Sequence, residues 1–169
     1  MAQRSFDAFK LWKDAQLKFD YYMVGLIAAV FTYTASKFIP QKIAFSQNSF
    51  ELLAVVFLAI SFYLGLKRLE IDLVIQTISL KKTENTEMLH VARQNVLSGG
   101  SQNLDDGTYI SVEEAEKRAI ECQEIKAKLD EALKVQAKKS EKLFKFRNRA
   151  LAIALFLIVF SKVLGVYFI

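Results

Sequence analysis

The chain has 169 residues, of which 53% are hydrophobic and 24% are charged, and its formal net charge is +5. A single cysteine, Cys122, excludes an intrachain disulfide, and a single histidine, His90, excludes a Cys/His metal site. The hydrophobic residues gather in three runs, at 21–38, 50–66 and 150–169, and the charge lies almost wholly outside them. This pattern leaves no room for a large independent soluble core.

The N-terminal residues 1–20 are expected to form an amphipathic helix at a membrane interface. Phe9, Trp12 and Phe19 can share one face of such a helix, while the lysines point to water. Acidic residues precede the first hydrophobic run, and no small-residue cleavage site follows a short apolar core. We therefore expect the first run to remain as an anchor and not to be removed as a signal peptide.

Each hydrophobic run holds 17 to 20 residues. A helix needs roughly 20 residues to cross a hydrocarbon core of about 30 Å, and inside a bilayer only a helix satisfies every backbone group of such a segment. The sequence therefore predicts three transmembrane helices, the first two within 21–66 and the third at 150–169. Gly25 and Ala29, four residues apart in the first run, are a small-residue pair suited to close helix contact.

Lysines and arginines indicate the orientation of these helices. Four precede the first run, two lie in the short loop after it, and seven crowd into 134–149, directly before the third run. The positive-inside bias therefore places the N-terminus and the segment 67–149 in the cytoplasm and the C-terminus outside, and we expect a bacterial plasma membrane.

The middle segment 67–149 has helical spacing of its apolar residues and predicts an antiparallel helical hairpin. One helix continues the second span to about Leu97, and the other runs from about Val112 into the third span. The turn formers at 98–107 close the hairpin, and Ser111 with Glu114 forms a capping box. A break at 81–83, giving a short extra helix, is the alternative. The fold class is thus an all-α integral membrane protein with three transmembrane helices and a long cytoplasmic hairpin continuous with spans two and three.

Two sets of hairpin residues are candidates for binding. A three-four repeat like one side of a coiled coil runs through Cys122, Ile125, Leu129 and Ala132. A basic cluster before the third span is expected to set the orientation and to contact anionic lipid headgroups, and it lacks the interleaved aromatic residues of a nucleic-acid groove. The headgroup-contacting members are Lys138, Lys139, Lys142, Lys145, Arg147 and Arg149.

Two further features bear on assembly. Lys162 lies inside the third span and Glu51 begins the second on the same outer side, so these charges pair with each other, line a pore, or snorkel to the headgroups. The stretch 66–80 is apolar over a wider arc than one neighbouring helix covers, which predicts packing against a second copy or against the N-terminal helix.

No residues of the chain form a catalytic set, a metal site or a cofactor site, so we expect no enzymatic activity. The leading hypothesis is a helical membrane protein that oligomerises and engages a cytoplasmic partner through its hairpin. The alternative is an oligomeric pore-forming or membrane-perturbing effector. The order of the elements is similar in outline to small membrane effectors of bacterial anti-phage defence, which is an architectural analogy.

Overall fold

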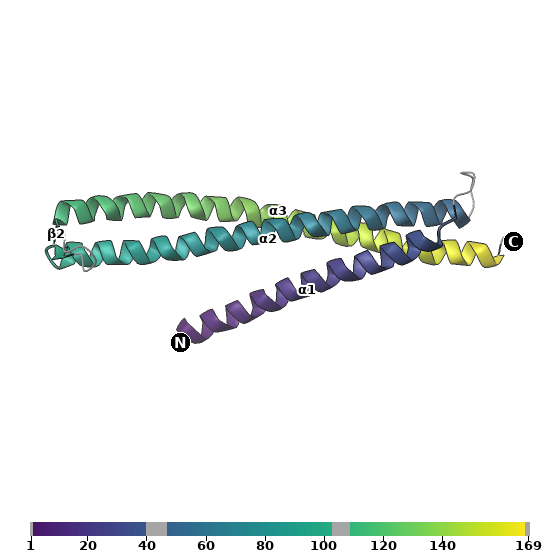
Figure 1. Cartoon of the computed structure of the whole chain (residues 1–169), viewed down its shortest axis with the longest axis horizontal. Helices are drawn as coiled ribbons and strands as arrows, with labels where there is room; N and C mark the ends of the chain where they lie inside the picture. The colour runs from purple at the N-terminus through teal and green to yellow at the C-terminus, as the bar shows by residue number, and fades with distance from the viewer. Residues whose placement is uncertain (1, 40–46, 103–108, 168–169) are drawn as a thin grey trace. The chain divides into compact units, whose positions relative to one another are not determined.

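The computed structural model describes residues 2–39, 47–102 and 109–167, with side chains described for 14–39, 47–100 and 110–165. Three long helices make up nearly all of it: α1 (Ala2–Lys37), α2 (Gln47–Leu97) and α3 (Val112–Tyr167) (Figure 1). A two-residue antiparallel ladder, β1 (Ser101–Gln102) with β2 (Tyr109–Ile110), lies between α2 and α3. The all-helical prediction is therefore confirmed. Phe9 and Trp12, the predicted interfacial aromatics, lie outside the residues whose side chains are described.

Two of the helices, α2 and α3, are long and apolar enough to cross a membrane by length and composition. Both helices continue without a break from the apolar run into the predicted hairpin. Helix α2 ends at Leu97 and α3 begins at Val112, where the sequence predicts the ends of the hairpin. The alternative break at 81–83 is absent, because α2 is helical throughout that stretch. Helix α1 is likewise continuous through residue 20, where the sequence predicts a boundary between an interfacial helix and a transmembrane helix.

Residues 1–70 and 140–169 form one compact unit, in which the three helices pack through seams of three-four spacing. Such spacing places side chains on one stripe of a helix, as in coiled coils. The buried stripes are Asp20, Val24 and Ile27 on α1; Ala54, Leu58, Ser61, Gly65 and Arg68 on α2; and Ser140, Arg147, Ala150, Ala154 and Ser161 on α3. Most of these side chains are small, which allows the close approach typical of helices packed in lipid.

Gly65 marks a close approach of all three helices in this unit. A Cβ atom at Gly65 would lie 2.8 Å from Cγ2 of Val24 and 3.5 Å from Cδ of Arg147, so α1 and α3 both reach α2 here. Gly25 has no such role, because a Cβ atom there would meet nothing within 4 Å. Gly25 and Ala29 are both exposed, so the predicted close helix contact does not form within the chain.

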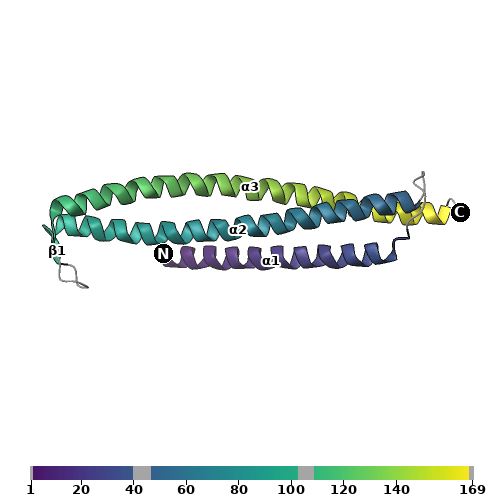
Figure 2. The ribbon, with the colours of Figure 1, turned by 45° about the horizontal axis from the view of Figure 1, so that its top comes forward.

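Residues 71–139 form the second compact unit, a hairpin of α2 and α3 that lie side by side (Figure 2). Its buried apolar side chains are Leu89 and Ala92 of α2 and Ala115 of α3. Polar contacts join the same faces: Asn85 Nδ2 donates to the Cys122 carbonyl oxygen at 2.7 Å, and Lys82 Nζ lies 2.5 Å from Asp130 Oδ1. The interface between the two helices is thus narrow and partly polar.

The hairpin closes through local backbone chemistry. The amide of Gly100 donates to the Asn95 carbonyl and that of Gly99 to the Val96 carbonyl, which is the Schellman pattern of a helix C-terminus. Gly99 and Gly100 have φ of 76° and 108°, a region that favours glycine. At the start of α3 the Glu114 amide donates to Ser111 Oγ at 3.2 Å, so the predicted cap at Ser111 is confirmed.

The predicted three-four repeat on α3 needs one correction. Cys122, Leu129 and Ala132 are half-buried, but Ile125 is 46% exposed and lies outside the interface between the helices. The buried stripe is centred instead on Ala115, with Cys122 and Leu133 in phase with it. The buried stripe differs from the predicted one because small and polar side chains fill the narrow interface. Apolar spacing in the sequence does not reveal such residues.

Candidate functional site

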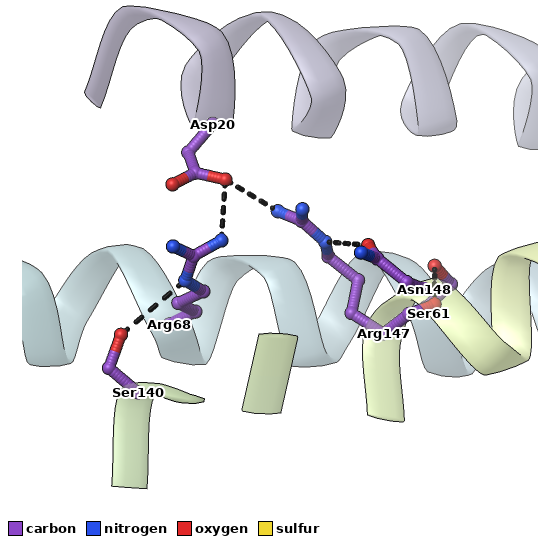
Figure 3. A network of polar contacts seen from close by, with 6 residues as sticks. All are labelled: Asp20, Ser61, Arg68, Ser140, Arg147 and Asn148. Atoms are coloured by element: carbon purple, nitrogen blue, oxygen red, sulfur yellow. Dashed lines mark hydrogen bonds and ion pairs between the residues drawn. The ribbon is translucent and has the colours of Figure 1, made fainter. Parts of the chain in front are cut away.

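A buried ionic cluster joins the three helices of the first unit. Asp20 of α1 accepts hydrogen bonds at one carboxylate oxygen, Oδ1, from Arg68 Nη1 of α2 at 2.6 Å and from Arg147 Nη1 of α3 at 3.0 Å (Figure 3). The three residues are 1%, 5% and 1% exposed, respectively. Charge-assisted bonds of this kind are about twice as strong as neutral ones, so Asp20 fixes the position of α1 along both neighbours.

Neighbouring groups orient both guanidiniums. Arg68 Nε donates to Ser140 Oγ at 3.4 Å, and Arg147 Nε donates to Asn148 Oδ1 at 3.2 Å (Figure 3). The Phe144 ring lies under both, with its centroid 4.4 Å from Cζ of Arg68 and 5.1 Å from Cζ of Arg147. Arginine suits such a site because its planar cation stacks on aromatic rings while it donates in the plane.

Two guanidiniums share the carboxylate of Asp20 through a single oxygen. The second oxygen of Asp20, Oδ2, is buried and has no hydrogen-bond partner in the described part of the chain. Burying charges is costly, and such a cluster gives little net stability over an apolar core of the same shape. Its value lies in specificity, because any slip of one helix would leave a buried charge unpaired.

Sequence reasoning missed this cluster and assigned its members to other roles. Arg147 is predicted to contact lipid headgroups, which is wrong because its side chain is 1% exposed and bound to Asp20. The other five members of the predicted basic cluster, Lys138, Lys139, Lys142, Lys145 and Arg149, are exposed. One sequence signal for the cluster exists: Arg68 and Arg147 are in phase with the small residues of their seams.

Glu51 and Lys162 form a second ionic site. Lys162 Nζ lies 2.6 Å from Glu51 Oε1 in the same chain, so of the three alternatives the structure shows the direct pair. Gln47 Nε2 donates to the same oxygen at 3.3 Å. The Lys162 side chain is 67% exposed and that of Glu51 is 18% exposed, so the pair lies at the surface of the unit.

The two ionic sites are separated by helix segments with little charge. Along α2, Glu51 and Arg68 are 17 positions apart and Lys67 is the one charged residue between them, and along α1 no charged residue lies between Asp20 and Lys37, which are also 17 positions apart. Along α3, only Arg149 intervenes in the 15 residues from Arg147 to Lys162. At the helical rise these separations are about 23 to 26 Å, close to the thickness of a hydrocarbon core.

The hairpin carries its own ion pair, between Lys82 and Asp130. The hydrogen bond from Lys82 holds the pKa of the Asp130 carboxyl below its ordinary value of 3.8. Because the folded pKa is the lower one, the pair contributes stability above pH 3.8 and loses it as the pH falls through the folded pKa. Both side chains are more than a third exposed, so the effect is small.

No group of three or more His, Cys, Asp or Glu side chains that could hold a metal occurs among the described residues. Residues 103–107 of the predicted turn lie outside them. Comparison with known proteins finds no family model, no curated protein and no solved structure that matches the chain. Function is therefore argued from the geometry of the two ionic sites and the hairpin.

Proposed function

We propose that the chain is a three-span membrane protein without enzymatic activity, which oligomerises and engages a partner through its cytoplasmic hairpin. Helices α1, α2 and α3 would cross the bilayer between the Asp20 cluster and the Glu51–Lys162 pair. The Asp20 cluster would lie at the cytoplasmic boundary, where the exposed lysines of α3 contact anionic headgroups.

The charge-free segments support the membrane placement. In α1 the stretch 21–36 holds no charged residue, and it packs through Val24 and Ile27 against the two helices that are long and apolar enough to span. Because Asp20 is bonded to Arg68 and Arg147, the uncharged part of α1 begins at the same level as those of α2 and α3. This alignment favours α1 as the third span.

One observation carries the proposal for the hairpin: it exposes more apolar side chains than it buries. Three apolar side chains are buried in the described part of 71–139, whereas Leu80 and Ile120 are 61% and 60% exposed on different helices. The other large exposed ones are Leu73, Val74, Met88, Val91, Leu97, Val112, Ile125 and Val135. Exposed apolar surface of this extent marks protein interaction sites.

Site-specific photo-crosslinking in native membranes tests this proposal. A photoreactive residue replaces Leu80 or Ile120 of the hairpin, or Leu155, which is exposed in the proposed third span. We expect discrete protein adducts from at least one hairpin position, with a second copy recognised by a mass increase of 19.3 kDa. The proposal would be contradicted if the protein is a monomer in lipid nanodiscs and if neither Leu80 nor Ile120 gives a protein adduct.

A second candidate function is an oligomeric pore with the Glu51–Lys162 pair near the conducting path. The Lys162 side chain is paired with Glu51 yet 67% exposed, so in an assembly it would be able to line water. Pore formation predicts that expression depolarises cells and that Lys162→Leu abolishes the depolarisation. Lys37→Leu is the control, since Lys37 is also exposed and ends α1. Unchanged membrane potential on expression of the wild-type chain would exclude the pore.

A further inference from the structure

One face of the hairpin has the features of a docking site. The inference that a partner binds there rests on the proposed function. We name this face the α2 outer row and define it by the exposed apolar residues Leu73, Leu80, Met88 and Val91 of α2. Their exposed fractions are 52%, 61%, 63% and 55%. All four lie in the hairpin unit, on one continuous helix.

The spacing of the row places it on the side of α2 opposite α3. With 3.6 residues per turn, Leu73, Leu80 and Val91 lie within about 20° of one another around the helix axis, and Met88 lies about 60° away. The residues of α2 that face α3, among them Asn85, Leu89 and Ala92, are buried and lie on the far side. Helix α3 therefore cannot cover the outer row.

The charges nearest the centre of this face are acidic. Glu84 and Glu87, both exposed, lie between Leu80 and Met88 and within about 40° of Leu73 and Val91 around the helix axis. Of the cations in this part of α2, Lys81 lies at the edge of the row, about 20° from Met88, whereas Lys82 and Arg93 project about 160° or more away from Leu73. The row is thus an apolar strip with two negative charges near its centre and one cation at its edge.

This charge pattern argues against two possible occupants. Copies inserted in the same bilayer carry Glu84 at the same height, so a two-fold contact through this face would oppose Glu84 to Glu84 and Glu87 to Glu87. Like charges opposed across a helix pair are destabilising. An anionic lipid surface is repelled for the same reason. The strip requires an apolar surface that carries positive charge.

We propose that the α2 outer row binds a basic amphipathic helix of a partner protein. The row extends from Leu73 to Val91, about 27 Å at the helical rise, which is the length of a partner helix of about five turns. Apolar side chains of the partner at three-four spacing would cover Leu80 and Met88, and flanking lysines or arginines would pair with Glu84 and Glu87. Such a contact would resemble the pairing of two helices in a coiled coil.

The test measures peptide binding to the full chain in nanodiscs of zwitterionic lipid, with empty nanodiscs as the blank. The probe is a fluorescent 18-residue peptide with leucines at three-four spacing and flanking lysines, and its partner peptide has glutamates in place of the lysines. The protein variants are Leu80→Ser and the pair Glu84→Gln with Glu87→Gln. The matched controls lie on α3: Ile120→Ser, with nearly the same exposure as Leu80, and the pair Glu121→Gln with Glu124→Gln, with the same three-residue spacing.

We expect the lysine peptide to bind and the glutamate peptide to bind at least about tenfold more weakly. Both α2 variants should weaken binding of the lysine peptide by about tenfold, and both α3 controls should leave it unchanged. Circular dichroism shows whether each variant folds, and the comparison of the two peptides does not depend on any variant. Equal binding of both peptides, no binding of either, or equal losses in the α3 controls would overturn the inference. Adducts from Ile120 in the crosslinking experiment would then still support the proposed function.

Discussion

Asp20 is the residue on which the contacts between the three helices converge. One of its oxygens bonds to arginines that are 48 and 127 positions away in sequence. The guanidiniums in turn stack over Phe144 and bond to Ser140 and Asn148, so the orientation of several side chains depends on one carboxylate. Removing this charge deprives both buried guanidiniums of their bond to Asp20.

The first prediction concerns this charge. Asp20→Asn should destabilise the protein in nanodiscs by about 3 kcal/mol or more, because breaking a buried ion pair leaves an uncompensated charge. Asp14→Asn, an exposed change on the same helix, should have little effect. Adding Arg147→Gln to Asp20→Asn should restore part of the loss. Chemical unfolding followed by intrinsic fluorescence measures all three variants, and equal stability of the Asp20 and Asp14 variants would contradict the role assigned to the cluster.

At the scale of the elements, Gly65 allows α1, α2 and α3 to approach at the level of the cluster. A methyl group at this position would collide with Val24, whereas one at Gly25 would meet open space. Both glycines lie inside helices, where alanine has the higher intrinsic propensity by about 1 kcal/mol. Alanine substitutions at the two positions therefore distinguish the effect of helix propensity from the effect of packing on stability.

The second prediction follows from this contrast. Gly25→Ala should leave the stability unchanged or raise it by up to about 1 kcal/mol. Gly65→Ala should lower it by about 1 to 3 kcal/mol, because the new methyl group forces the helices apart. Val24→Ala in the Gly65→Ala background should recover much of the loss by removing the colliding atom. A Gly65→Ala protein as stable as Gly25→Ala would show that the helices do not pack closely there.

The sequence predicts the elements better than it predicts the cluster, for a physical reason. The ends of the hairpin at Leu97 and Val112 depend on local chemistry, since glycines terminate α2 and Ser111 caps α3. The cluster depends on three residues from distant parts of the chain. A charged residue at the end of an apolar run is typical of an orientation signal, so the one mark of burial at Arg68 and Arg147 is their phase with the small residues of the buried stripes. Ile125 is the opposite case, an apolar residue that the sequence places in the interface and the structure leaves exposed. Apolar spacing alone does not predict which side of α3 faces α2.

At the scale of the whole molecule, the number of helices that cross a membrane decides the topology. If all three helices span, residues before Asp20 and those of the hairpin lie on one side of the membrane, and the end of α1 lies on the other. If α1 does not span, both of its ends lie on the same side. Cysteine accessibility distinguishes these arrangements because the chain has a single natural cysteine, Cys122, which can be replaced by serine.

The third prediction concerns labelling with a membrane-impermeant maleimide in a Cys122→Ser background. Ser36→Cys, an exposed position near the end of α1, should react in intact cells. Asp14→Cys and Ser98→Cys, which are also exposed, should react only after permeabilisation. The serine background without a new cysteine is the control. Reaction of Asp14→Cys and Ser36→Cys under the same condition would exclude α1 as a span.

The uninterrupted course of α2 has a mechanical consequence. One ladder of backbone hydrogen bonds connects Leu80 to Arg68, about three turns away. Torque that a bound protein applies at Leu80 would reach Arg68 through this ladder, and the Asp20 bridge there opposes the rotation. Loss of that bridge would remove this resistance to rotation of α2 at Arg68.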